Sequence, residues 1–277
     1  MTDIDFIKMS GAGNDFILID NRGSRYTIDW KKLAPVISHR RYGVGADGLL
    51  IVEDSLKTDF KMKYYNSDGS YGGMCGNGGR CIALYVMNDL NNREIKFEAL
   101  DDIYSAKQID TNVILRMRNP KDIKSNIINI SDEIIPLLSI DTGAPHVVIF
   151  QKDISPKLRD MIQSYGIKNI GSQIRHHQEF QPLGTNVNFV DILDANRISM
   201  RTYERGVEDE TLACGTGAIA SAIASSINNY FASPIDVKTR SGETLTIKFR
   251  RKYDEFSEIE LIGSAKEIFR GRFSYQE

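Results

Sequence analysis

The sequence predicts an α+β fold built from two pseudo-symmetric α/β lobes. Three observations support this prediction. Motifs of the first half recur in the second half, short β-branched or aromatic runs bounded by Gly, Asn and Asp are spread along the chain, and two helix-like runs each follow a C-G-x-G turn. The 277 residues are long for one compact domain and sufficient for two of ordinary size.

Four short motifs recur in the same order, at offsets of 132 to 139 residues. Each match is weak alone, because Gly and small polar residues recur by chance, but four matches in order indicate a duplicated unit. Such a unit predicts paired sites, one from each copy. The pairs are Ser10-Gly11-Ala12 with Thr142-Gly143-Ala144, Gly45-Ala46-Asp47 with Gly184-Thr185-Asn186, Met62 to Asn66 with Met200 to Glu204, and Cys75 to Gly79 with Cys214 to Ala218.

Local pattern predicts the elements of each copy. The first motif of each copy precedes an apolar run, which we interpret as a turn entering a strand, and other β-branched runs predict further strands. Helices are fewer, and each clear one is rich in Ala, Leu or Ile. The predicted strands include Phe16 to Ile19, Ile114 to Met117, Val147 to Phe150 and Leu245 to Phe249, and the two clearest helices are Arg80 to Met87 and Ala218 to Ile227.

The boundary between the lobes is expected at Asn119-Pro120. Proline disfavours helix in the residue before it and cannot donate to a sheet ladder. We therefore expect an N-terminal lobe over residues 1–119, which carries Cys75, and a C-terminal lobe over residues 120–263, which carries Cys214. No low-complexity linker separates them.

Composition excludes several classes of function. Apolar residues make up 41% and charged residues 26%, and the formal net charge is −2. The chain therefore lacks the excess of positive charge that is typical of nucleic-acid-binding proteins. No stretch approaches the ~18 uninterrupted apolar residues of a membrane span. The start, MTDIDFIKMS, lacks the basic region and apolar run of a signal peptide. We expect a cytoplasmic protein that binds neither nucleic acid nor membrane.

No motif indicates a metal or cofactor. His176 and His177 are adjacent and would not face one ligand together. There is no G-x-x-x-x-G-K-[ST] loop, and no Lys stands out as a Schiff-base site. The three cysteines are too few and too scattered for a disulfide scaffold, so we expect reduced thiols, with Cys81 a small buried hydrophobe.

Cys75 and Cys214 stand at positions suited to proton transfer. A cysteine at a glycine-rich turn that opens a helix feels unpaired backbone N–H groups and the positive end of the helix dipole. Free Cys titrates near ~8.5, and a helix N-terminus lowers its pKa, so such a thiol can act as a base near neutral pH. The glycines let an anion approach the backbone donors closely.

Two such turns would converge on one substrate carboxylate if the copies face each other across a cleft. Removal of an α-proton moves charge into the carboxylate, which fixed N–H donors stabilise more than the ground state. Two bases of the same kind suit a reversible inversion, because each serves as acid in one direction and as base in the other. For either turn taken alone, the alternative interpretation is a structural helix cap beside a buried thiol with no catalytic role.

The sequence resembles diaminopimelate epimerases, the enzymes that interconvert L,L- and meso-diaminopimelate without a cofactor. The resemblance spans nearly the whole chain. It rests on Lys8-Met9-x-Gly11-x-Gly13-Asn14-Asp15-Phe16, Gly43-x-Gly45-Ala46-Asp47-Gly48, Asn66-x-Asp68-Gly69, Met74-Cys75-Gly76-Asn77-Gly78-x-Arg80-Cys81, Glu204-Arg205-Gly206 and Ala213-Cys214-Gly215-Thr216-Gly217.

The resemblance implies two mirrored lobes, each a curved mixed sheet around a central helix, with a last strand at about 264–277 returning to the first lobe. It implies two-base epimerisation of a small amino-acid substrate in lysine and peptidoglycan precursor biosynthesis, by a homodimer. Cys75 and Cys214 match the catalytic pair, and His146 and Glu204 match residues that tune the pKa of a cysteine. Substrate-binding positions are matched by Asn14, Asn66, Gly76, Asn77, Asn186, Glu204, Arg205, Gly215 and Thr216.

Two departures from the family pattern concern substrate choice. This chain has Ala144 where many members carry Asn, and Gly48 where some carry Gln. A histidine or other amino-acid racemase on the same scaffold is therefore an alternative, although Arg205 suits a second carboxylate. Proline racemases typically have His where this chain has Asn77. A different class of protein, a noncatalytic ligand-binding or thiol-redox protein, would use the cysteine pair as a reversible disulfide.

Overall fold

The computed structural model describes residues 1–130, 132–228 and 230–276 and confirms the predicted α+β class. The chain divides into two compact units. Unit 1 comprises Met1–Arg116 and Ile262–Glu277, and unit 2 comprises Met117–Leu261. Within the described ranges, no helix is long and apolar enough to cross a membrane.

Unit 1 is a mixed sheet in the order β17-β1-β2-β3-β4-β5-β6-β7. The β2–β3 and β4–β5 pairs are parallel, and the other neighbours are antiparallel. The elements are β1 (Thr2–Gly11), β2 (Asn14–Asp20), α1 (Trp30–Ile37), β3 (Gly48–Glu53), β4 (Phe60–Asn66), α2 (Gly76–Asp89), β5 (Glu94–Ala99), β6 (Asp102–Ile109), β7 (Asn112–Arg116) and β17 (Lys266–Tyr275).

Unit 2 is a second mixed sheet in the order β8-β9-β10-β11-β12-β14-β15. The β10–β11 and β12–β14 pairs are parallel and the others antiparallel, while β13 pairs with the far end of β12. The elements are β8 (Lys121–Ile130), β9 (Glu133–Asp141), β10 (Pro145–Phe150), α3 (Pro156–Tyr165), α4 (Lys168–Arg175), β11 (Asn186–Asp194), β12 (Arg197–Glu204), β13 (Asp209–Thr211), α5 (Gly215–Ile227), β14 (Ile235–Lys238), β15 (Thr244–Lys252) and β16 (Glu255–Ser264).

The two units share one topology, which supports the duplication. Each begins with two antiparallel pairings, followed by parallel, antiparallel, parallel and antiparallel pairings. Thus β17 and β1 correspond to β8 and β9, β2 and β3 to β10 and β11, and β4 to β12. In both units the central helix, α2 or α5, starts directly after a cysteine.

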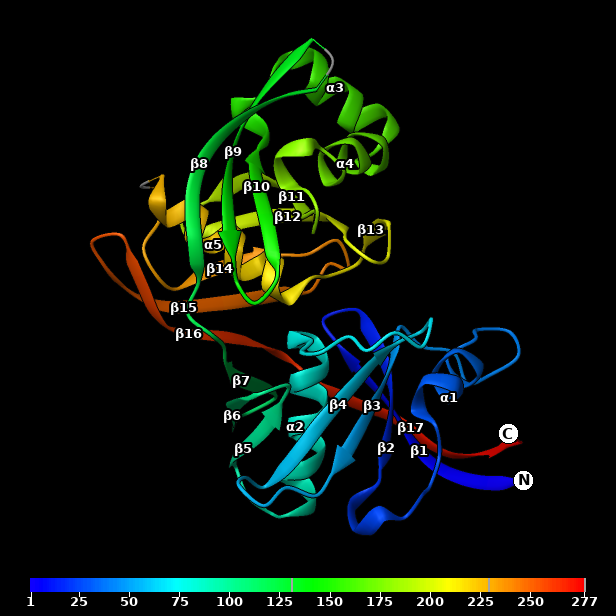
Figure 1. Ribbon diagram of the computed structural model, residues 1–277. Helices are drawn as coiled ribbons and strands as arrows, with labels where there is room; N and C mark the ends of the chain where they lie inside the picture. Colours follow the sequence, from blue (N-terminus) through cyan, green and yellow to red (C-terminus); the bar gives the residue numbers. More distant parts are fainter. Residues whose placement is uncertain (131, 229, 277) are drawn as a thin grey trace. The chain divides into compact units, whose positions relative to one another are not determined.

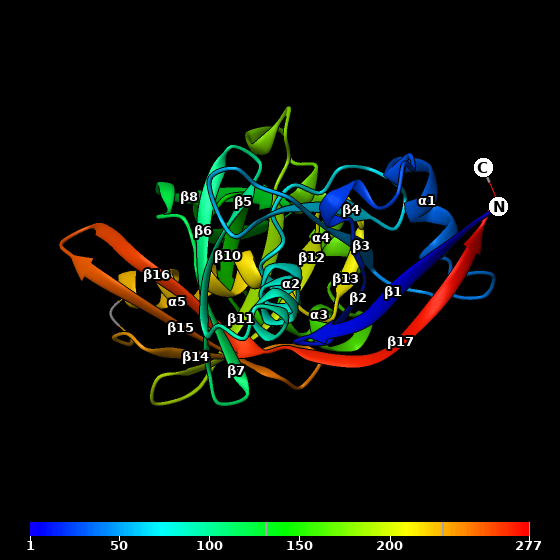
Figure 2. The ribbon, with the colours of Figure 1, turned by 90° about the horizontal axis from the view of Figure 1, so that it is seen from below.

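Each sheet surrounds its central helix. Helix α2 contacts β1 to β7 and β17, and α5 contacts β9 to β12, β14 and β15. Figure 1 shows α2 against the strands of unit 1, and Figure 2 views it nearly along its axis. The predicted helices Arg80 to Met87 and Ala218 to Ile227 are the later parts of α2 and α5, which begin at Gly76 and Gly215. Propensity alone places the starts too late, because glycine is tolerated in a first turn whose N–H groups have no intrahelical partner.

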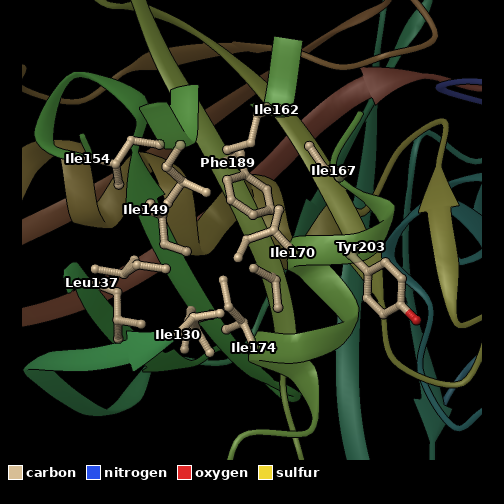
Figure 3. Packing of buried hydrophobic residues seen from close by; sticks show 14 of the residues in the cluster. Ile130, Leu137, Ile149, Ile154, Ile162, Ile167, Ile170, Ile174, Phe189 and Tyr203 are labelled. Atoms are coloured by element: carbon tan, nitrogen blue, oxygen red, sulfur yellow. The ribbon is translucent and has the colours of Figure 1, made fainter. Parts of the chain in front are cut away.

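Strand alternation divides the side chains of unit 2 between two helical layers. Val147, Ile149, Val187, Phe189 and Tyr203 belong to one buried cluster with residues of α3 and α4. Figure 3 shows this cluster, in which Ile162 and Ile170 lie beside Phe189. The intervening residues of β10, β11 and β12 therefore lie on the opposite face, toward α5.

Candidate functional site

Cys75 caps the helix of unit 1. Its backbone is extended, and its Sγ accepts a hydrogen bond from the Gly78 N–H at 3.4 Å. The first intrahelical bond runs from the Gly79 N–H to the Cys75 carbonyl at 2.7 Å, so the N–H groups of Gly76 and Asn77 precede the helical ladder. Cys75 is half-buried and free of disulfides. This sulfur lies where the helix dipole favours negative charge.

A chain of side-chain hydrogen bonds fixes the turn after Cys75. The Asn77 amide donates to Asn14 Oδ1 at 2.6 Å, and the Asn14 amide donates to Asp47 Oδ2 at 2.9 Å. On the other side, Arg80 donates to Asn77 Oδ1 at 2.9 Å and to the Gly76 carbonyl at 3.4 Å. Arg80 is fully buried. Two predicted binding residues, Asn14 and Asn77, are therefore brought together beside Cys75.

An ionic cluster holds the strand that carries Asn14. Lys8 and Arg40 both bind Asp15, and Arg40 also binds Asp47 at 2.7 Å. Burial opposes ionisation of Asp15, but the hydrogen bonds from Arg40 and Lys8 outweigh it and hold the pKa of that carboxyl below its usual value. Asn66 ends β4 in the same unit, where its amide donates to Ser70 Oγ at 2.9 Å.

Cys214 caps the helix of unit 2 in the same way. Its backbone is extended, and the first intrahelical bond runs from the Ala218 N–H to its carbonyl at 2.9 Å. Its side-chain partner differs from that of Cys75, because Cys214 Sγ lies 3.5 Å from the hydroxyl of Thr216. Cys214 is buried and forms no disulfide.

His146 lies beside this second turn. Its Nε2 is 2.9 Å from Thr216 Oγ1, and its Nδ1 is 3.1 Å from the amide nitrogen of Asn188. Burial, helped by the positive charge of Arg205, lowers the pKa of His146 to about 3. The imidazole is therefore neutral near pH 7.

The remaining predicted residues of unit 2 lie where β11 begins and β12 ends. Asn186 donates to the Pro145 carbonyl at 2.9 Å, and its Oδ1 accepts from the Arg205 N–H at 2.9 Å. The Arg205 guanidinium donates to the Leu183 carbonyl at 3.3 Å. Glu204 is the last residue of β12 and is half-exposed. Asn186 thus ties β10 to the segment that carries Glu204 and Arg205.

Sequence reasoning gave no role to Asn188, Asp47 or Arg80, although each contacts a predicted site residue. A signal was present for Asn188, since an amide between Val187 and Phe189 interrupts an apolar strand. A buried polar residue in such a run needs partners and so points to a network. Asp47 and Arg80 were part of the motifs, but their partners are distant in sequence.

A family model described as diaminopimelate epimerase matches residues 6–121 and 138–266. A diaminopimelate epimerase from Aquifex aeolicus is 36% identical over 284 residues, covering 98% of each chain. Another, from Chlorobaculum tepidum, is 39% identical over 268 residues, covering 95% of this chain and 98% of the relative. The chain belongs to the diaminopimelate epimerase family.

Solved structures of other proteins have a similar fold. A phenazine biosynthesis protein of the PhzF family from Bacillus anthracis superposes with a TM-score of 0.72 at 13% identity, covering 99% of this chain and 100% of the other. A hydroxyproline epimerase from Agrobacterium vitis superposes with a TM-score of 0.69 at 12% identity, covering 98% and 92%. At these identities the likeness shows the architecture alone.

Proposed function

We propose that this chain interconverts L,L- and meso-diaminopimelate without a cofactor, using Cys75 and Cys214 as the two bases. The supporting observation is that both units present a cysteine, in no disulfide, at the N-terminus of the central helix, within a chain that belongs to the diaminopimelate epimerase family. This activity supplies lysine and peptidoglycan precursors.

The proton balance of the reaction is simple. One cysteine, as the thiolate, takes the α-proton and becomes a thiol, while the C–H electron pair moves toward the carboxylate. The other cysteine, as the thiol, gives its proton to the opposite face of the α-carbon and becomes the thiolate. No oxidant or net proton is consumed, and the reverse reaction exchanges the two roles.

The backbone of the two turns stabilises the developing negative charge in this proposal. The N–H groups of Gly76, Asn77, Gly215 and Thr216 precede the helical ladders, so they are suited to donate hydrogen bonds to the α-carboxylate. Their positions are fixed before substrate arrives, so they stabilise the charge without reorganisation. His146 and Glu204 tune the protonation of the cysteines.

The distal part of the substrate is assigned to polar residues. Arg205 binds the second carboxylate through its bidentate fork, and Asn14, Asn66, Asn186 and Glu204 orient the amino and carboxylate groups. In support, the Arg205 N–H donates to Asn186 Oδ1, and the Arg205 guanidinium donates to the Leu183 carbonyl through Nη1. Asn186 therefore fixes the backbone position from which the Arg205 side chain extends.

We also place the enzyme in the cytoplasm as a homodimer. The composition, with 26% charged residues, supports the first assignment, and the family resemblance supports the second. Light scattering coupled to size exclusion measures the oligomeric state, and a monomeric mass at micromolar concentration would contradict the dimer.

Proton exchange tests the proposed activity. The purified protein is incubated in D₂O with L,L-diaminopimelate, meso-diaminopimelate or L-histidine, and the α-proton signal is followed by ¹H NMR. We expect loss of this signal with diaminopimelate alone, and no loss with Cys75→Ala or Cys214→Ala. Cys81→Ala is the matched control, because Cys81 is fully buried and holds no catalytic role.

Other outcomes distinguish the alternatives. Exchange with L-histidine in place of diaminopimelate would retain the two-thiol mechanism and overturn the substrate. Ala144, which replaces the Asn of many family members, gives that result a structural basis. Absence of exchange under reducing conditions would favour a binding or redox protein.

A further inference from the structure

A buried polar chain leads from strand β11 to Cys214. Asn188, which is fully buried, lies on the α5 face of the sheet. Its amide nitrogen contacts His146 Nδ1 at 3.1 Å, His146 Nε2 contacts Thr216 Oγ1 at 2.9 Å, and Thr216 Oγ1 contacts Cys214 Sγ at 3.5 Å. These four residues belong to unit 2, as do Val147 and Thr202, which also bond Asn188.

The orientation of the Asn188 amide follows from its other partners. Its nitrogen lies 2.9 Å from the Val147 carbonyl, which can only accept, and its oxygen lies 2.9 Å from the Thr202 hydroxyl. A flipped amide would set two carbonyl oxygens against each other. The nitrogen therefore donates one proton to Val147 and the other to His146.

The direction of each later hydrogen bond follows from this first one. His146 Nδ1 accepts from Asn188, so the proton of the neutral imidazole is on Nε2. Nε2–H then donates to Thr216 Oγ1. Since the hydroxyl accepts there, its own proton is available to Cys214 Sγ, and a sulfur that accepts a hydrogen bond is stabilised as the thiolate.

We infer that Asn188 is a positioning residue, which fixes the His146 tautomer so that the Thr216 hydroxyl donates to Cys214 and favours its thiolate form. This role rests on the proposed function only in giving the thiolate a catalytic use. Asn188 does not touch substrate and acts through His146 and Thr216. The positive charge of Arg205 also disfavours a protonated His146.

The tautomer is measured directly in the free enzyme. ¹⁵N-histidine labelling with long-range ¹H–¹⁵N correlation distinguishes the two ring nitrogens, and His146→Gln identifies the His146 signals. We expect a protonated Nε2 and a bare Nδ1 from pH 5 to pH 9. A protonated Nδ1 in the unmodified protein would overturn the inference, and this result needs no variant to fold.

The effect on the cysteine is measured by alkylation. Iodoacetamide rates at Cys214 are followed against pH by peptide mass spectrometry, with Cys75 of the same molecule as the internal reference. In Asn188→Leu we expect the Cys214 profile to move up by about one pH unit, which corresponds to ~1.4 kcal/mol, and the Cys75 profile to stay unchanged. An unchanged Cys214 profile would overturn the inference.

Two controls separate this role from general destabilisation. Ser225→Ala removes another buried hydroxyl of α5, one that bonds Ser221 within the helix, and should leave the His146 tautomer and the Cys214 profile unchanged. Asn188→Asp replaces the donor with an acceptor, and we expect the His146 proton to appear on Nδ1. Neither readout depends on turnover of diaminopimelate, so failure of the proposed function would leave these results interpretable.

Discussion

Gly78 and Gly217, the third residues of α2 and α5, occupy equivalent positions in the repeat. They should nevertheless differ greatly in how well they tolerate an added methyl group. A Cβ at Gly217 would lie 2.4 Å from Asn188 Oδ1 and 3.3 Å from Cys214 Sγ. A Cβ at Gly78 would lie 3.0 Å from the end of the Leu50 side chain and 3.5 Å from Cys75 Cβ. We therefore expect Gly217→Ala to destabilise the protein much more than Gly78→Ala.

The magnitude follows from what must move. Asn188 is held by Val147, His146 and Thr202, so its retreat from a new methyl group breaks buried hydrogen bonds. Overpacking costs ~1–3 kcal/mol and a buried group left unpaired costs ~1–3 kcal/mol, whereas the gain in helix propensity is at most ~1 kcal/mol. Gly217→Ala should lower the free energy of unfolding by about 2–4 kcal/mol. Gly78→Ala should stay within about 1 kcal/mol of the unmodified protein, because Leu50 can adjust and the propensity gain offsets the cost.

Urea unfolding measures the difference. Far-UV circular dichroism follows both units, fluorescence of the single tryptophan, Trp30, reports on unit 1, and hydrogen exchange of α2 and α5 peptides localises the effect. Equal destabilisation by the two substitutions would refute the reasoning, as would a larger effect at Gly78.

Three further predictions concern the buried and charged groups. The pKa of His146 is about 3 in the folded protein and near 6.5 in the unfolded chain, so on acidification the unfolded chain binds the proton first. The free energy of unfolding, compared with that of His146→Asn, should therefore fall by up to ~1.4 kcal/mol per pH unit between about pH 6.5 and pH 3. Parallel pH curves for the two proteins in urea titrations would contradict this. Arg80→Met should cost about 2–4 kcal/mol in thermal or urea unfolding, because it leaves the buried Asn77 amide oxygen without its donor, while the exposed Arg93→Met should cost little. Asp15→Asn should destabilise the protein above pH 4, where the carboxylate of lowered pKa is bound by Lys8 and Arg40, and this difference should shrink on acidification; a constant difference down to pH 2 would argue against it.

The repeat made most of the fold predictable. Motifs at offsets of 132 to 139 residues indicated equivalent strands and a central helix in both halves, and the apolar runs at Phe16 and Val147 lie inside β2 and β10. Helix starts were less predictable, because Gly76 and Gly215 have low propensity and are helical only through the turn geometry after each cysteine. Helices α3 and α4 were not predicted, since α3 depends on a serine cap at Ser155 and on packing against the sheet.

Motif reasoning predicts a set of site residues, whose roles stay predictions, but it does not predict how their side chains are bonded. It selects Cys75, Cys214 and their turns, yet it could not show that Asn77 contacts Asn14 or that Thr216 contacts His146. Those contacts depend on how a helix start lies against strands far away in sequence. Asn188 was missed for the same reason, because its three partners come from β10 and β12.

The paired contacts show how one duplicated scaffold holds two different sulfurs. The residue after each Cys-Gly bonds to a residue at the start of β2 or of its counterpart β10, Asn77 to Asn14 and Thr216 to His146. In unit 1 both partners are amides, and Cys75 accepts from the Gly78 backbone. In unit 2 the partners are an imidazole and a hydroxyl, which can pass a change of tautomer to Cys214. The backbone turns match while these neighbours differ, so the proton affinity of each sulfur can be set separately. The proposed two-base reaction requires this, because one cysteine begins as base and the other as acid.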